Sequence, residues 1–198
     1  MKKLCNILLV LFMLFATCCS KNSGLVNILD INNNIIIDLK YATKDNFLHK
    51  NIYQSTEAKL LKDVADALDK AQEEFKTHGV GLKVWDAYRP LEAQKAMWAT
   101  LPDERYVANP AMGGRHTRGT AVDVTLIDLA TNQELAMPTE FDNFTEKAHR
   151  EYSYLDSKIK ANVELLESIM HKHGFIGLPT EWWHFDYHDW ESRPVIVD

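Results

Sequence analysis

The chain has 198 residues, of which 46% are hydrophobic and 25% charged, a composition typical of a soluble globular protein. This length suits one domain with a sizeable core, and no repeat or low-complexity tract divides it. The formal net charge is −6 at pH 7. That balance argues against nucleic acid as a partner, because nucleic acid requires a basic surface. Nothing in the composition indicates a protein partner.

The N-terminal segment has the layout of a secretory signal. Lys2 and Lys3 precede a nearly unbroken apolar run at 4–15, and small residues follow at 16–20. The apolar run is too short for an ordinary membrane-spanning helix. We therefore expect export to the periplasm or cell envelope.

All three cysteines, Cys5, Cys18 and Cys19, lie in this segment, so the exported body has no thiol and no disulfide. Cysteines at the cleavage region resemble the lipid-attachment site of bacterial lipoproteins, which favours lipid anchoring at Cys18 or Cys19. The residues just before them depart from the usual Leu-small-small run, and the alternative is cleavage and release. We expect a signal at 1–19, a tether at 20–29 and one domain at 30–198.

The first part of the body predicts a strand followed by a long helix. A turn and a short strand are expected within 31–39. Apolar residues then recur at steps of three and four, which predicts a helix capped at Ser55 or Thr56 and running through Lys76. Gly79 ends this helix.

The remaining pattern alternates strands and helices. Strands are predicted at 80–84, 120–126, 175–178 and 182–187, helices at 90–98 and 159–170, and a hairpin near 128–134. Helices flanking a small, mostly antiparallel sheet define an α+β fold in a single domain.

His116, Asp123 and His184 are residue types that bind catalytic zinc, which takes three protein ligands and keeps one position open. His116 lies in a loop that enters a predicted strand, and Asp123 lies within that strand on the face opposite its aliphatic side chains. Each residue alone would have an ordinary structural explanation. As a set they predict one zinc ion on the sheet.

Glu181 precedes His184 by three residues, beside an aromatic run that should be buried. A carboxylate is costly to bury without a purpose, and here it is placed to take a proton from the attacking water. Positions three apart in a straight strand face opposite sides. The prediction therefore requires Glu181 to lie in a bend set by Pro179 and Thr180, with His184 inside the strand.

Arg89 precedes Pro90 at a strand-to-helix junction, which holds its backbone out of helical geometry. Its guanidinium would then point into a cleft and stabilise the oxyanion formed as water attacks a carbonyl. The alternative is an ordinary salt bridge to Asp86 or Glu92, and spacing alone favours that alternative.

These stretches together resemble the motifs of the D-alanyl-D-alanine dipeptidases, a family of zinc metallopeptidases. The similar segments are the two zinc stretches at 115–126 and 181–184, an arginine segment at 86–90, a substrate-side segment at 41–47, and an acidic segment, Phe-Asp, at 141–142. The match runs in order through nearly all of the body. One departure is Gly114, a position at which the wider group of D-Ala-D-Ala metallopeptidases usually has serine. This departure leaves the substrate preference open.

The resemblance implies a role for each matching residue. His116, Asp123 and His184 would be the zinc ligands, Glu181 the general base, Arg89 the stabiliser of the transition state, and Tyr41 and Asp142 the substrate-side residues. Asp142 would hold the ammonium of the substrate, although it could instead cap the segment at 143–149.

The implied activity is zinc-dependent hydrolysis of the dipeptide D-alanyl-D-alanine outside the cytoplasm, in cell-wall peptide turnover or glycopeptide resistance. Two alternatives remain. One is a D,D-carboxypeptidase that acts on longer peptidoglycan stems, and the other is an inactive binding module stabilised by zinc. A purely structural site would need neither Glu181 nor Arg89.

Overall fold

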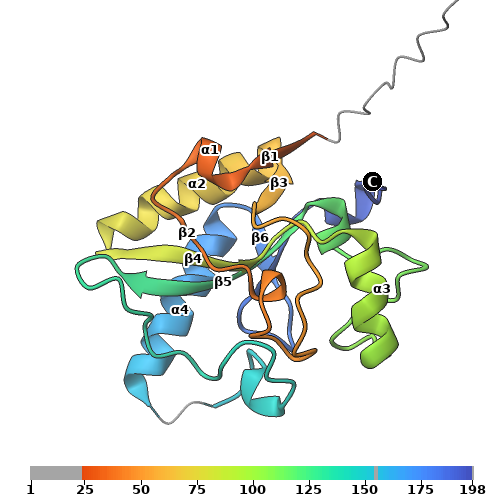
Figure 1. The fold of residues 1–198 in the computed structure, drawn as a ribbon. Helices are drawn as coiled ribbons and strands as arrows, with labels where there is room; N and C mark the ends of the chain where they lie inside the picture. The colour runs from red at the N-terminus through yellow and green to blue at the C-terminus, as the bar shows by residue number, and fades with distance from the viewer. Residues whose placement is uncertain (1–23, 154–155, 198) are drawn as a thin grey trace, which may run out of the picture.

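The computed structural model describes residues 24–153 and 156–197 and has a five-stranded sheet at its centre (Figure 1). The sheet order is β2-β4-β5-β7-β6, with bounds β2 (Ile36–Ile37), β4 (Val80–Asp86), β5 (Ala121–Asp128), β6 (Phe175–Gly177) and β7 (His184–Tyr187). β2 runs parallel to β4, whereas the other neighbouring pairs are antiparallel. The predicted α+β fold with a mostly antiparallel sheet is confirmed.

Two long helices build the core against this sheet. α2 (Lys62–Thr77) packs against β4, α4 (Ser157–Lys172) packs against β5 and β6, and the two helices contact one another (Figure 1). Phe75 of α2 and Val124 of β5 are both fully buried in the core cluster. The Asp156 side chain caps α4 by accepting two backbone N–H bonds, as expected for aspartate at a helix start.

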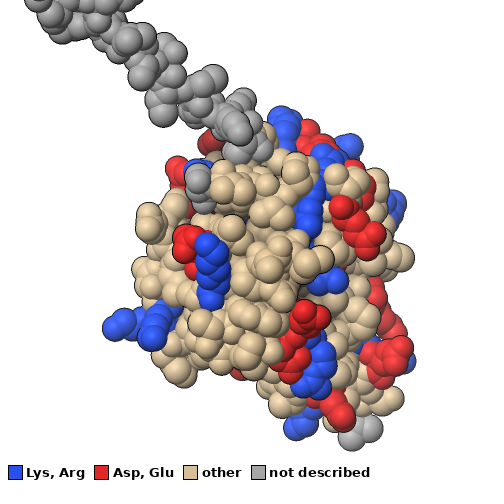
Figure 2. Space-filling model, turned by 90° about the vertical axis from the view of Figure 1, so that its right-hand side faces the viewer, with Lys and Arg blue, Asp and Glu red and all other residues tan. Residues whose placement is uncertain are grey.

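The shorter elements lie around this core. They are α1 (Ile28–Ile31), α3 (Leu91–Thr100) and four 3₁₀ turns, η1 (Lys40–Ala42), η2 (His116–Arg118), η3 (Glu146–Ala148) and η4 (Trp190–Ser192). α3 stands apart from the two long helices (Figure 1). No helix among the described residues is long and apolar enough to cross a membrane. Acidic and basic side chains are interspersed on the face shown in Figure 2.

The predicted tether at 20–29 extends too far. β1 (Leu25–Asn27) pairs with β3 (Lys59–Leu61) in a separate antiparallel ribbon, and Ile28 is fully buried. The folded body therefore begins several residues before the predicted boundary. Short apolar runs do not reveal by themselves whether a partner strand exists elsewhere in the chain.

The predicted helix start at Ser55 or Thr56 is wrong, because α2 begins at Lys62. The residues just before it form β3, and the backbone N–H of Leu61 donates to the carbonyl of Gly119. The apolar spacing fits a helix through these residues equally well. The strand is preferred because β1 and Gly119 supply hydrogen-bond partners that the local sequence does not show.

Candidate metal centre and active site

A row of polar residues crosses three neighbouring strands of the sheet. β5 pairs with β7 so that Asp123 lies opposite His184, and β4 pairs with β5 so that Asp86 lies opposite Asp123. The register of β4 shifts between Val84 and Asp86. Without this bulge Asp86 would share the face of Val84, since side chains two apart point the same way. The bulge therefore brings Asp86 to the same side as Asp123.

The third member of the cluster comes from the loop before β5. His116 begins η2, which ends at Gly119 in the left-handed conformation with φ of 67°. A Cβ atom at this glycine would meet the Leu25 side chain at 2.7 Å. The left-handed conformation favours glycine here, and it lets the chain turn from His116 directly into β5.

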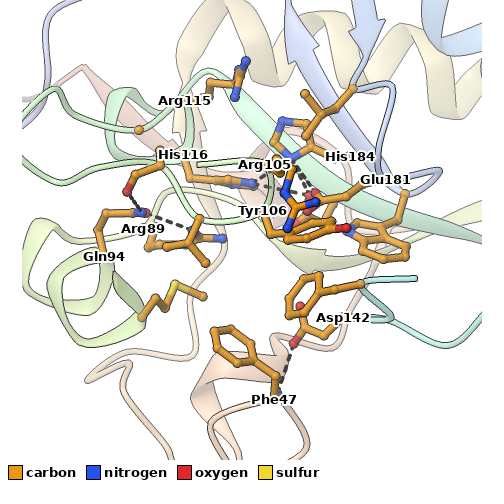
Figure 3. A pocket seen from close by; sticks show the side chains of 18 of the residues that line it. Phe47, Arg89, Gln94, Arg105, Tyr106, Arg115, His116, Asp142, Glu181 and His184 are labelled. Atoms are coloured by element: carbon orange, nitrogen blue, oxygen red, sulfur yellow. Dashed lines mark hydrogen bonds and ion pairs between the residues drawn. The ribbon is translucent and has the colours of Figure 1, made fainter. Parts of the chain in front are cut away.

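The predicted ligand set comes together in one buried cluster (Figure 3). His184 Nδ1 lies 2.9 Å from Asp123 Oδ1 and 3.2 Å from His116 Nε2, and His116 Nε2 lies 3.4 Å from Asp123 Oδ1. Tetrahedral ligands about 2.0–2.1 Å from one zinc ion are roughly 3.3 Å from each other. The spacing of these three atoms therefore fits one zinc ion.

Each histidine is fixed by a partner on its other ring nitrogen. His116 Nδ1 donates to the carbonyl of Ala87 at 2.8 Å, and His184 Nε2 bonds to Asp186 Oδ1 at 2.9 Å. Arg115 Nε in turn lies 2.8 Å from Asp186 Oδ2. A carbonyl or carboxylate partner of this kind sets the tautomer of a metal-binding histidine and orients its ring. The lone pairs of His116 Nε2 and His184 Nδ1 are thereby directed into the cluster.

The electrostatics of the cluster favour a cation. Burial alone would lower the pKa of His184, but the carboxylates of Asp186 and Asp123 raise it to about 10. Burial alone would raise the pKa of Asp123, yet His116 and His184 hold it well below its usual range. Without a metal, the raised pKa of His184 lets a proton on this imidazole supply positive charge next to Asp123. A divalent ion would supply that charge instead and leave both imidazoles neutral.

Glu181 lies in the turn before β7, and His184 is the first residue of that strand, as the predicted bend requires. Its side chain is buried, and its Oε2 atom lies 3.9 Å from His184 Nδ1. Burial raises the pKa of this carboxyl above its usual range. The group is thus adjacent to the metal ligands and suited to carrying a proton.

Arg89 makes the salt bridge to Asp86 that spacing alone favours, and it also lines the pocket. Its Nε and Nη2 atoms donate to Asp86 Oδ2 at 3.1 and 2.7 Å, and its Nη1 atom donates to Gln94 Oε1 at 2.9 Å. Glu92, the other predicted partner, pairs with Lys95 instead. The same arginine lines the pocket that contains the metal cluster. In Figure 3 Arg89 and Glu181 lie on different sides of the histidine pair.

Asp142 and Tyr41 meet at the other end of this pocket. The Tyr41 hydroxyl donates to Asp142 Oδ1 at 2.8 Å, and the backbone N–H of Phe47 donates to Asp142 Oδ2 at 3.2 Å. Burial raises the pKa of Asp142 to about 7. Asp142 does not cap the following segment, because the N-cap of η3 is Thr145. The carboxylate is therefore held as part of the pocket wall.

Several residues of this site were not predicted from the sequence. Gln94, Arg105 and Tyr106 line the pocket, and Asp186 supports His184 from behind. The alternation of β7 places Asp186 on the same face as His184 and could have indicated it. Gln94 and the loop of Arg105 and Tyr106 gave no comparable signal, since their positions depend on how α3 docks.

A buried His-Asp-His set with a neighbouring carboxylate and a fixed arginine is the arrangement of a zinc hydrolase. The family model described as D-ala-D-ala dipeptidase matches residues 21–195. The chain therefore belongs to the D-Ala-D-Ala dipeptidase family. Family membership and the ligand set together identify the metal as zinc.

Individual relatives agree with this assignment. The D-alanyl-D-alanine dipeptidase of Escherichia coli (strain K12) is 38% identical over 179 residues, which cover 90% of this chain and 92% of that protein. The D-alanyl-D-alanine dipeptidase of Enterococcus faecium is 34% identical over 172 residues, which cover 77% of this chain and 85% of that protein. The solved LdcB LD-carboxypeptidase gives a TM-score of 0.47 at 21% identity, covering 83% of this chain and 68% of that chain, a likeness too distant to bear on activity.

His184→Ala should abolish zinc binding, because it removes one of three ligands whose atoms lie within 4.8 Å of one another. Elemental analysis of the purified variant tests this expectation. The matched control is His173→Ala, which removes a histidine bonded to Glu74 away from the cluster and should keep one zinc per chain. Stoichiometric zinc in His184→Ala would refute the ligand assignment.

Proposed function

We propose that this chain hydrolyses D-alanyl-D-alanine to two molecules of D-alanine. The observation that carries the proposal is the convergence of Glu181 and Arg89, from separate elements, on the pocket that contains the His-Asp-His set. A zinc-stabilised binding module would need neither group. The relatives named as D-alanyl-D-alanine dipeptidases support the same substrate.

Zinc held by His116, Asp123 and His184 would polarise the peptide carbonyl and lower the pKa of the attacking water. Glu181 takes the proton from that water and returns it to the leaving amine nitrogen. Arg89 stabilises the negative charge that develops on the carbonyl oxygen. Because its guanidinium is already bonded to Asp86, it needs no reorientation as that charge appears.

Asp142 would pair with the ammonium group of the free dipeptide. Its position supports this role, because Tyr41 and the Phe47 backbone hold the carboxylate in the pocket wall. A longer peptidoglycan stem has an amide in place of this ammonium and would leave the buried carboxylate without a cation. The dipeptide is therefore favoured over the D,D-carboxypeptidase alternative.

The first test concerns Glu181. Glu181→Ala should keep its fold and its zinc but lose roughly 10²–10⁴-fold in turnover, the usual contribution of general acid–base catalysis. The measurement is D-alanine release from D-alanyl-D-alanine, with zinc content determined on the same sample. Glu92→Ala, which removes an exposed glutamate of α3, should retain the parent rate. Parent activity in Glu181→Ala would show that the mechanism is wrong.

The second test concerns substrate length. Leaving a charged group unmatched costs a few kcal/mol, so kcat/KM for D-alanyl-D-alanine should exceed that for its N-acetyl form and for a stem pentapeptide by about 10²-fold. Asp142→Asn should reduce this preference, because the amide no longer carries the charge that selects the ammonium. Equal values for all three substrates in the parent protein would place it with the carboxypeptidases.

We also propose that the protein is exported and lipid-anchored at Cys18 or Cys19, two residues that lie outside the described part of the chain. The support is the apolar run at 4–15 and the start of the family match at residue 21. D-alanyl-D-alanine outside the cytoplasm arises from the cell wall, which suits wall turnover or glycopeptide resistance.

Expression of the full chain in a bacterial host with radiolabelled palmitate tests the export proposal. Label should appear in the envelope fraction and should disappear when Cys18 and Cys19 are both replaced by Ala. Unlabelled, shortened protein in the soluble periplasm would overturn the anchor and leave export standing. Full-length protein in the cytoplasm would overturn both.

A further inference from the structure

We propose that Gln94 is a positioning residue for Arg89. By holding one terminal nitrogen of the guanidinium, it would fix the direction in which the arginine meets the reacting carbonyl. This inference rests on the role proposed for Arg89 above and extends it to a residue that does not itself contact the metal ligands.

Gln94 is completely buried in α3, and both ends of its amide are bonded. Its Oε1 atom accepts from Arg89 Nη1 at 2.9 Å, and its Nε2 atom donates to the carbonyl of Ala108 at 2.6 Å. Because the second bond fixes the amide, the oxygen cannot rotate away from Arg89. Gln94 thereby ties the arginine to the loop that borders the pocket, as the dashed lines between Arg89 and Gln94 illustrate (Figure 3).

Asp86 and Gln94 hold the guanidinium on two different edges. Asp86 accepts from Nε and Nη2, whereas Gln94 accepts from Nη1. A guanidinium has five N–H donors in one plane, and these three bonds fix that plane. Two donors remain, one on each terminal nitrogen. The Tyr53 hydroxyl also interacts with this guanidinium, which still leaves a terminal N–H for the carbonyl oxygen that develops negative charge.

Gly114 packs directly against Gln94. A Cβ atom at residue 114 would lie 3.3 Å from Gln94 Oε1, which is tighter than ordinary van der Waals contact, and 3.4 Å from the Cβ atom of Ala108, which is ordinary contact. The space that a side chain at 114 would need is therefore bounded by Gln94. This fit explains why glycine suits the position at which the resembling group usually has serine.

A purely structural role for Gln94 would be docking α3 onto the loop through the carbonyl of Ala108. The two roles predict different outcomes, because only positioning acts through the guanidinium of Arg89. Gln72 offers a matched control. It is also a completely buried glutamine, and its Oε1 accepts from the backbone of Leu82 in the core between α2 and β4.

The experiment compares Gln94→Met, Gln94→Glu and Gln72→Met in the full zinc-loaded protein. For each variant we measure kcat and KM for D-alanyl-D-alanine, the zinc content and the unfolding midpoint. Gln94→Met should lower kcat by about 10-fold or more, as expected for a lost bond to a charged group, with little change in KM and no loss of zinc. Gln94→Glu keeps an acceptor for Arg89 but loses the donor to the Ala108 carbonyl, so it should recover only part of kcat. Gln72→Met should lower the unfolding midpoint without changing kcat.

The deciding comparison repeats Gln94→Met in an Arg89→Lys background, which keeps a charge beside Asp86 but lacks the guanidinium fork. Gln94→Met should then have no further effect on kcat. If Gln94→Met lowers kcat equally in the parent and in the Arg89→Lys protein, the positioning role is wrong. The same holds if Gln94→Met lowers only the unfolding midpoint. In both cases the role of Arg89 stands. Parent kcat in Arg89→Lys and in Arg89→Ala would instead overturn the role of Arg89 itself.

Discussion

The register of β5 between β4 and β7 places the side chains of Asp86, Asp123 and His184 in one row. Side chains alternate along a strand, so a slip by one residue would turn Asp123 toward the helices and an aliphatic side chain toward the pocket. The register is held by Val122, Val124 and Leu126 of β5, all completely buried in the core. Burial of these aliphatic residues thus positions the metal ligand on the opposite face.

This dependence explains which parts of the site could be predicted from the sequence. The alternation of β5 is local, and it placed Asp123 opposite the aliphatic face. Pro179 and Thr180 are also local signals, and they correctly located Glu181 in a bend before β7. In each case the residues that determine the geometry lie within a few positions of the functional side chain.

The features that escaped prediction depend on partners far away in the chain. β3 exists because β1 pairs with it, and the hydrophobic pattern of the segment before Lys62 does not reveal that partner. The bulge at Trp85, which turns Asp86 toward the pocket, depends on the pairing of β4 with β5. Gln94 reaches Arg89 only because α3 docks against the loop of Ala108. Such tertiary contacts override or add to what local periodicity indicates.

The buried carboxylates of the site have different partners and therefore different electrostatic environments. Asp86 is paired with Arg89, and Asp123 is held ionised by two histidines that lower its pKa. Burial acts in the opposite direction on Glu181 and raises its pKa, so this carboxyl exchanges a proton more readily near neutral pH. When the surroundings push the pKa values of two neighbouring groups apart, one group stays charged and the other can carry a proton. This difference supports the proposal that Asp123 binds the metal and Glu181 carries the proton, although both are acidic side chains in the same pocket.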